Sequence, residues 1–206
     1  MKIVIWGIRR SGNSPVREWI ANVTSLRQVI NCNPTKTEDD AVNSIEELPP
    51  LFPKKIKADY KIVILRDPYN LFASRIKHYD LLSSEKTWVD ENGATKLWRM
   101  YAKVFLEKPK GIILVNYNEF IKSVEYRKNL AKKLKCEFKD DTIQRVSDNG
   151  LGSSFDCLDY DGKAQKMPVF DRWTQYKDIE AFRGLFTPEI VQLSKQIFGM
   201  GVDFDG

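Results

Sequence analysis

A glycine-bounded loop near the N-terminus carries basic and hydroxyl side chains at a spacing that suits an anion. Residues 7–14 read GIRRSGNS, and the amides of such a loop and of a following helix point at one place. The spacing is that of the phosphate-binding P-loop, G-x-x-x-x-G-K-[ST], except that Asn13 replaces the lysine. Positive charge comes earlier, from Arg9 and Arg10. The loop therefore suits a phosphate-like group better than a magnesium triphosphate, and a plain turn with exposed arginines is the alternative.

A second polar pair follows the next apolar run of the sequence. Arg66 comes directly after residues 62–65, at the carboxyl end of a predicted strand, where ligands bind in open α/β sheets. Ser74 lies eight residues later, two turns into a helix that Asp67 caps and Pro68 begins. Because arginine suits bidentate recognition of phosphate, we expect Arg66 and Ser74 to reach one anion.

Strands and helices alternate around these motifs. The continuous apolar runs 3–6 and 62–65 are typical of strands buried on both faces of a parallel sheet. We predict one α/β domain over residues 1–206, a central parallel sheet flanked by helices of the P-loop nucleotide-binding type, with its ligand at the carboxyl ends of the strands. The other predicted elements are a helix over 15–29 with Ser14 as N-cap and Pro15 in its first turn, a short strand within 26–32, a polar excursion over 33–57 with a short helix at 41–48, and helices over 120–134 and 188–198.

Composition narrows the classes of partner. The 206 residues carry a net charge of +5, which favours anionic ligands, but no basic run indicates a nucleic-acid partner. Cys32, Cys136 and Cys157 have neither paired nor metal-type spacing, which favours free thiols in a reducing compartment. No apolar segment approaches the length of a membrane span, and the N-terminus lacks the apolar run of a signal peptide. We therefore expect a cytoplasmic protein, and the sequence indicates no oligomeric state.

The two motifs, taken in order, resemble those of the sulfotransferase family, whose donor is 3′-phosphoadenosine-5′-phosphosulfate (PAPS). Arg10 falls where that family has its catalytic lysine, and Ser11, Gly12, Asn13 and Ser14 fall on its Ser-Gly-Thr-Thr, in the loop that holds the 5′-phosphosulfate. Arg66 and Ser74 match the pair that holds the 3′-phosphate. The resemblance implies a sulfotransferase that releases 3′-phosphoadenosine-5′-phosphate (PAP) and requires no metal. Its cofactor-binding residues would include Arg9, Arg10, Ser11, Gly12, Asn13, Ser14, Arg66 and Ser74.

Three weaker matches extend the resemblance toward the C-terminus. Tyr117 resembles the tyrosine that lies near the adenine in the family, although a packing role in the core is an equal alternative. Phe155 falls in a segment like the family's Thr-Ser-Phe, whose ring packs against the adenine, since a ring face suits a base. Lys166 and Trp173 match the ends of the family's Arg-Lys-Gly-x-x-Gly-Asp-Trp motif. The Lys-Gly pair and the second glycine are missing, and Arg172 is a candidate for the lost charge.

The general base and the acceptor are left open by the sequence. In the family the base is His or Glu, and His78 is the single histidine. It follows the arginine motif, whereas the family's catalytic histidines precede it, so a structural role is the alternative. Glu18, Asp39 and Asp40 are the rivals. The acceptor is expected to be a small molecule or a glycan that offers a hydroxyl or an amine.

Two other functions stay open. A P-loop kinase of a nucleotide or metabolite would share the first strand, loop and helix. It is disfavoured by Asn13 and by the Arg66–Ser74 pair, which a kinase does not require. A non-catalytic PAP-binding module is the second alternative, because the sequence leaves the general base open.

Overall fold

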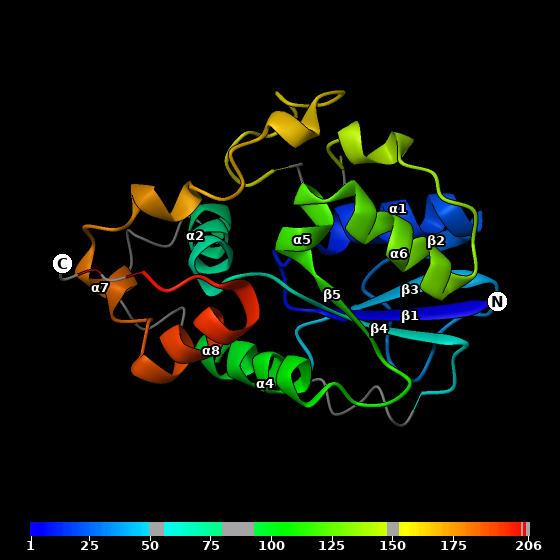
Figure 1. Cartoon of the computed structure of the whole chain (residues 1–206), viewed down its shortest axis with the longest axis horizontal. Helices are drawn as coiled ribbons and strands as arrows, with labels where there is room; N and C mark the ends of the chain where they lie inside the picture. Colours follow the sequence, from blue (N-terminus) through cyan, green and yellow to red (C-terminus); the bar gives the residue numbers. More distant parts are fainter. Residues whose placement is uncertain (50–55, 80–92, 148–152, 203, 205–206) are drawn as a thin grey trace.

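A five-stranded parallel sheet forms the centre of the computed structural model, which describes residues 1–49, 56–79, 93–147, 153–202 and 204 (Figure 1). The strands lie in the order β2-β3-β1-β4-β5, and every neighbouring pair is parallel. This arrangement confirms the predicted fold class. The strands are β1 (Lys2–Gly7), β2 (Arg27–Val29), β3 (Ala41–Glu46), β4 (Tyr60–Leu65) and β5 (Ile113–Asn116).

Helices cover both faces of the sheet. In Figure 1 α1, α5 and α6 lie above the sheet and α4 and α8 lie below it, while α2 stands near its left end. No helix in the described part of the chain is both long and apolar enough to cross a membrane. The helices are α1 (Asn13–Thr24), α2 (Pro68–Tyr79), α4 (Ala94–Glu107), α5 (Tyr117–Lys122), α6 (Val124–Leu134), α7 (Glu180–Arg183) and α8 (Pro188–Phe198), with 3₁₀ turns η3 (Asp141–Gln144), η4 (Ala164–Lys166) and η5 (Arg172–Gln175).

The sheet has a hydrophobic core on each face because side chains alternate along its strands. Ile3 and Ile5 of β1 pack into the core that Trp19 of α1 shares. Val4 and Trp6 of β1 pack into the opposite core. All five side chains are fully buried. Continuous apolar strands are what a sheet covered on both faces requires, and the predictions for β1 and β4 are therefore confirmed.

The helix predicted at 41–48 is wrong, because these residues contribute β3, which lies between β2 and β1. Asn43 and Ser44 are fully buried within it. The Asn43 amide donates to the carbonyl of Ile3 at 3.2 Å and to that of Glu38 at 2.9 Å. These bonds satisfy the buried side-chain amide of Asn43. A polar residue at this position makes the sequence of the strand resemble an exposed segment.

Three helix boundaries also differ from the predictions. The first helix ends at Thr24 rather than at Val29, because Ser25 adopts a left-handed conformation with φ 55°. Its N-cap is Gly12 rather than Ser14. The predicted helix over 120–134 is two helices divided at Ser123, whose hydroxyl accepts from the amide of Tyr126 and caps α6. The predicted start of the last helix at Pro188 is confirmed.

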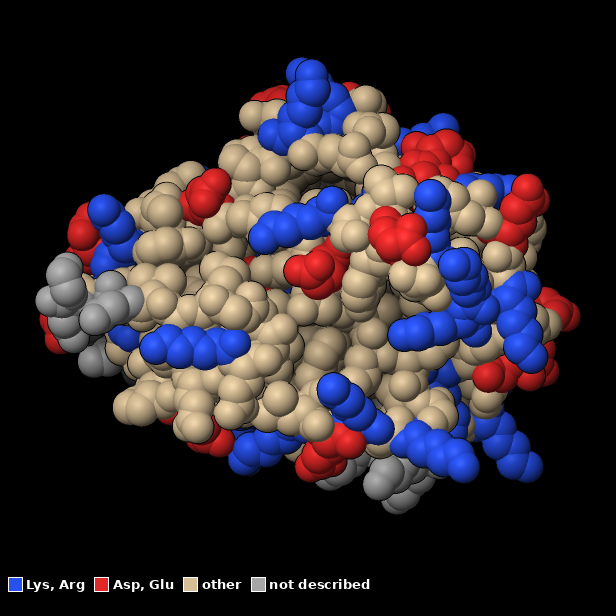
Figure 2. Space-filling view, viewed as in Figure 1, with Lys and Arg blue, Asp and Glu red and all other residues tan. Residues whose placement is uncertain are grey.

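The charged surface and the cysteines agree with the composition. Figure 2 shows Lys and Arg side chains interspersed with Asp and Glu over the face in view, as expected of a chain without a dominant basic run. Cys32, Cys136 and Cys157 are free thiols.

Candidate functional site

A cavity of about 290 Å³ lies at the carboxyl edge of the sheet. Residues that come within three positions of the ends of β1, β2, β4 and β5 line it, together with the last residue of β3. Parallel strands direct their carboxyl ends to one edge, so residues far apart in the sequence meet there. Those residues are Arg9 and Arg10, Ile30 and Asn31, Glu46, Arg66, and Tyr117.

The glycine loop is closed by its own hydrogen bonds and by Asn13. The amide of Ser11 donates to the carbonyl of Ile8 at 3.0 Å. The side-chain amide of Asn13 donates to that carbonyl at 3.0 Å and to Oε1 of Glu46 at 2.9 Å. A Cβ at Gly7 would lie 1.9 Å from Oδ1 of Asn13, so the asparagine folds back over the loop. The residue in the lysine position thus fastens the loop to β3 and does not extend as a lysine would.

Gly12 permits a close approach between the loop and Tyr117. Its φ is 86°, and an added Cβ would lie 2.1 Å from two ring carbons of Tyr117.

We expect Gly12→Ala to destabilise the protein by about 2–4 kcal/mol, from left-handed strain and overpacking together. Denaturant unfolding measures this loss. Gly111→Ala is the matched control, because Gly111 has φ 80° with open space around it. Equal losses in the two variants would show that the Tyr117 contact contributes nothing.

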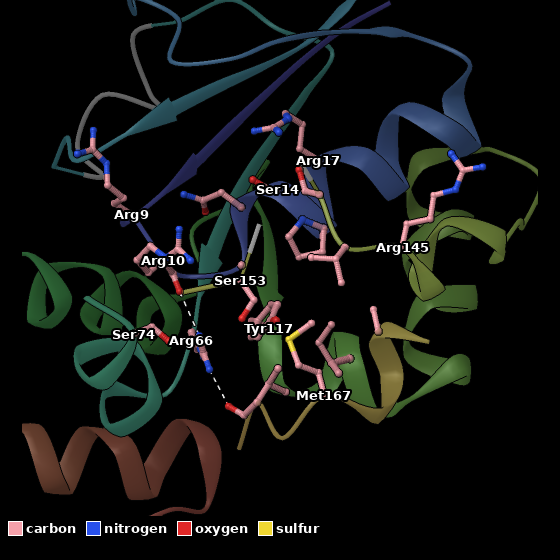
Figure 3. Close-up of a pocket in the computed structure, with 18 of the residues that line it drawn as sticks. Arg9, Arg10, Ser14, Arg17, Arg66, Ser74, Tyr117, Arg145, Ser153 and Met167 are labelled. Carbon is pink, nitrogen blue, oxygen red and sulfur yellow. Dashed lines mark hydrogen bonds between the residues drawn. The ribbon is translucent and has the colours of Figure 1, made fainter. Parts of the chain in front are cut away.

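Arg66 is buried beside the loop and forms hydrogen bonds with both the loop and Ser74. Its exposed fraction is 3%. Nη1 donates to Oγ of Ser74 at 3.1 Å and to the carbonyl of Arg10 at 3.3 Å, and Nη2 donates to the carbonyl of Val169 at 2.7 Å (Figure 3). Its guanidinium lies 5.2 Å from the centre of the Tyr117 ring. The residues predicted to share an anion are therefore neighbours in space.

Arg172 brings a second buried guanidinium to this part of the cavity. It is 5% exposed and lines the cavity. Nη2 donates to Oδ2 of Asp156 at 2.6 Å and to Oγ of Ser153 at 2.8 Å. Burial and then the positive charge of Arg66 lower the pKa of Arg172 to about 10. Two guanidiniums that repel one another at the wall of a cavity favour an anion between them.

Both guanidiniums keep donors that no described residue uses. Nε of Arg66 and Nε of Arg172 are buried and have no hydrogen-bond partner within the described ranges. A guanidinium has five N–H donors, and the three bonds made by Arg66 leave others unused. Buried donors without partners are rare in native proteins. The pair is therefore suited to a ligand with several acceptor oxygens, such as a phosphate.

Most of the predicted binding residues line this one cavity. Ser11 is the exception in the loop, since it is fully buried behind it. Phe155 does not line the cavity and packs beneath Arg172, 4.9 Å from its guanidinium, and against Tyr176. Lys166 is exposed on η4 and does not line the cavity either. The predicted residues that do line it are Arg9, Arg10, Gly12, Asn13, Ser14, Arg66, Ser74, His78 and Tyr117.

The four candidates for a general base are separated by the fold. His78 lines the cavity, and its pKa is lowered by burial and by the charges of Arg10 and other arginines, so the neutral imidazole prevails at pH 7. Glu18 does not line the cavity. Asp39 and Asp40 lie at the opposite edge of the sheet, before β3 begins. There Asp39 approaches Nζ of Lys2 to 3.3 Å, and Asp40 pairs with the terminal amino group at 2.5 Å, so neither reaches the cavity.

Two carboxylates beside the glycine loop were missed from the sequence. Glu46 lines the cavity, and its Oε2 lies 3.6 Å from Nε of Arg9. Oε1 of Glu47 accepts from the amide of Arg9 at 2.7 Å and from Nη1 of Arg75 at 2.5 Å, which holds the loop against α2. The positions of both carboxylates follow once residues 41–46 are recognised as a strand beside β1, because the carboxyl end of that strand meets the glycine loop.

The cavity thus combines loop amides, a helix N-terminus, several arginines and a carboxylate. Such donors hold and stabilise phosphate-like anions, and a nearby carboxylate is able to accept a proton. Within the described residues, no three His, Cys, Asp or Glu side chains are grouped to hold a metal ion.

Comparisons with known proteins identify the fold. No protein-family model matches the sequence, and no curated protein matches it. Mouse sulfotransferase SULT7A1, solved in complex with PAP, aligns over 95% of this chain and 84% of its own, with 17% identity and a TM-score of 0.54. The sulfotransferase domain of the Synechococcus PCC 7002 olefin synthase aligns over 98% and 95%, with 14% identity and a TM-score of 0.57. The sulfotransferase domain of the curacin biosynthetic pathway aligns over 95% and 96%, with 13% identity and a TM-score of 0.55. The chain therefore has the fold of sulfotransferases, as its motifs implied.

Proposed function

We propose that this protein is a sulfotransferase that uses PAPS and releases PAP, with a hydroxyl or an amine of a small molecule or carbohydrate as acceptor. One observation carries the proposal. The Arg66–Ser74 pair and a second buried guanidinium, that of Arg172, lie in the same cavity as a glycine loop. Two anion sites in one cavity suit a nucleotide that bears a 3′-phosphate and a 5′-phosphosulfate. The neighbour solved with PAP supports this choice of nucleotide.

The residues present fit such a nucleotide. The unused donors of Arg66 and Arg172 suit the 3′-phosphate. The amides of the loop and of α1, with Ser14, suit the 5′-phosphosulfate. Arg172 takes the place that the sequence resemblance gave to Lys166, since it is Arg172 that lines the cavity. Tyr117 also lines it, which agrees with a place near the base.

Chemistry in this cavity needs a cation for the leaving phosphate and a base for the acceptor. When bound, PAPS supplies the sulfuryl group, whose sulfur exchanges its bond to the bridging phosphate oxygen for a bond to the acceptor oxygen or nitrogen. Arg10 stabilises negative charge at the leaving oxygen, with Arg9 as second choice. Arginine does not give up its proton, so its role is electrostatic. Glu46 accepts the proton that the acceptor loses, with His78 as the alternative.

The same features argue against the other functions. The Asn13 amide is committed to Ile8 and Glu46, so it leaves no group to take the place of a kinase lysine. A carboxylate at the cavity supplies the base whose absence favoured a non-catalytic PAP-binding module. We also propose one domain over residues 1–206 and a cytoplasmic location, to which the three free thiols are suited.

A comparison of PAP, AMP and magnesium–ATP tests the proposal on the purified protein. A ligand that binds only the native state raises its stability in proportion to the logarithm of concentration over Kd. We expect PAP to raise the melting temperature most, with a Kd at least tenfold lower than that of AMP. A preference for magnesium–ATP would favour the kinase. Tight binding of PAP without transfer from labelled PAPS to any of a broad set of acceptors would favour the binding module.

A further inference from the structure

Arg17 is a buried arginine at the cavity that the proposed roles do not use. It lies one turn into α1, is 1% exposed and lines the cavity beyond Ser14 (Figure 3). Nε donates to Oε1 of Gln28 in β2 at 2.8 Å. Nη2 is buried and makes no hydrogen bond to any described residue, and the Glu18 carboxylate lies 3.8 Å from it. One hydrogen bond leaves most of its five donors unused.

A guanidinium held in this way needs an anion. Withdrawing an ion from water costs several kcal/mol, which close and well-bonded partners offset. Burial lowers the pKa of Arg17, while the charges of Glu18 and then Glu46 act against that shift. The long contact with Glu18 does not satisfy the geometry of a hydrogen bond. An oxyanion bound in the cavity would accept hydrogen bonds from the unused donors of Arg17.

The sheet order places Arg17 on the side of the loop away from the 3′-phosphate pair. Arg66 follows β4, on one flank of β1, whereas Glu46 ends β3 and Asn31 follows β2, on the other flank. Arg17 belongs to this second flank because its partner Gln28 lies in β2. Asn31 and Glu46 line the cavity there. With the 3′-phosphate beside β4, this flank is left for the acceptor.

We propose that Arg17 binds an oxyanion of the acceptor, so that this protein sulfates an acceptor that is already anionic. The inference rests on the proposed function. The acceptor carries a carboxylate, sulfate or phosphate close to the hydroxyl or amine that receives the sulfuryl group. Proximity follows because Glu46, which accepts the proton, lines the same cavity as Arg17.

The test uses the full chain saturated with PAP and titrated calorimetrically with sodium sulfate or sodium acetate at constant ionic strength. We expect saturable sulfate or acetate binding in the wild type and at least tenfold weaker binding in Arg17→Gln, with the Kd for PAP changed by less than threefold. A lower Kd for acetate than for sulfate indicates a carboxylate on the acceptor. A lower Kd for sulfate indicates a sulfate or phosphate on the acceptor. Arg99→Gln is the matched control, since Arg99 pairs with Glu189 on α8 and does not line the cavity.

Three results would overturn the inference. The first is that neither anion binds to the wild-type complex with PAP. The second is that Arg17→Gln keeps full affinity for the anion while Arg10→Met loses it, which would place the anion at the leaving-group site. The third is that Arg17→Gln loses PAP and the anion equally while remaining folded by circular dichroism. Arg17→Lys, which keeps the charge, is the second variant and should retain part of the affinity for the anion. Failure of the wild type to bind PAP would instead defeat the proposed function.

Discussion

Arg66→Ala should weaken the binding of PAP by about thirtyfold or more, which corresponds to about 2 kcal/mol, while the Kd for AMP changes by less than threefold. The two nucleotides differ by the 3′-phosphate alone. Arg66 is buried at 3% exposure, bonds Ser74 and keeps unused donors. A charge-assisted bond in such a site contributes more than a neutral one. Calorimetric titration of each nucleotide measures the difference.

Two further variants make this result specific. Arg66→Lys keeps the charge and loses the planar fork, so we expect it to recover only part of the affinity for PAP. Ser74→Ala removes one partner of the pair, and we expect a smaller loss, about threefold to tenfold. Loss of PAP and AMP in equal measure would contradict the assignment of Arg66 to the 3′-phosphate. Circular dichroism spectra and unfolding curves separate that outcome from a general loss of structure.

The part of this site predictable from sequence is the part fixed by local spacing. The loop over 7–14 and the pair Arg66 and Ser74 each lie within one strand–loop–helix unit, whose geometry follows from its own residues. Asp67 caps α2 as predicted, accepting from the amide of Asn70 at 2.8 Å. Continuous apolar runs likewise identified β1 and β4, because strands buried on both faces have little other composition.

The missed part depends on contacts between distant segments. Arg172 reaches the cavity because Asn70 of α2 holds the segment around it. The Asn70 side chain donates to the carbonyl of Phe170 at 2.9 Å and accepts from the amide of Trp173 at 3.4 Å. Lys166 matched the family motif in charge, yet no such contact directs it inward. Glu46 was missed for a related reason. The polar side chains of β3 are satisfied by neighbouring strands, which a single sequence does not display.

Glu46→Gln should lower the rate of sulfuryl transfer at least a hundredfold while leaving the Kd for PAP within threefold. Removal of a general base costs a factor of this size. The substitution is nearly isosteric, and a glutamine oxygen still accepts from the Asn13 amide, which donates to Glu46 at 2.9 Å. The glycine loop therefore keeps its anchor to β3. The measurement is the initial rate of transfer from labelled PAPS to the best acceptor found by screening.

The pH profile separates the two candidate bases. If His78 accepts the proton, the wild-type kcat/KM falls as the pH drops through the pKa of the imidazole, which burial and the charges of Arg10 and other arginines lower, and His78→Gln lacks that acid limb. If Glu46 accepts the proton, His78→Gln keeps the wild-type profile. His78→Gln is the competing variant, because His78 also lines the cavity and its lowered pKa keeps it neutral at pH 7. Asp40→Asn is the distant control, since Asp40 pairs with the terminal amino group at the opposite edge of the sheet. A hundredfold loss and a missing acid limb in His78→Gln, with Glu46→Gln active, would transfer the role to the histidine. The acceptor's hydroxyl or amine would then be approached from α2 rather than from β3, on the side of the loop away from Arg17.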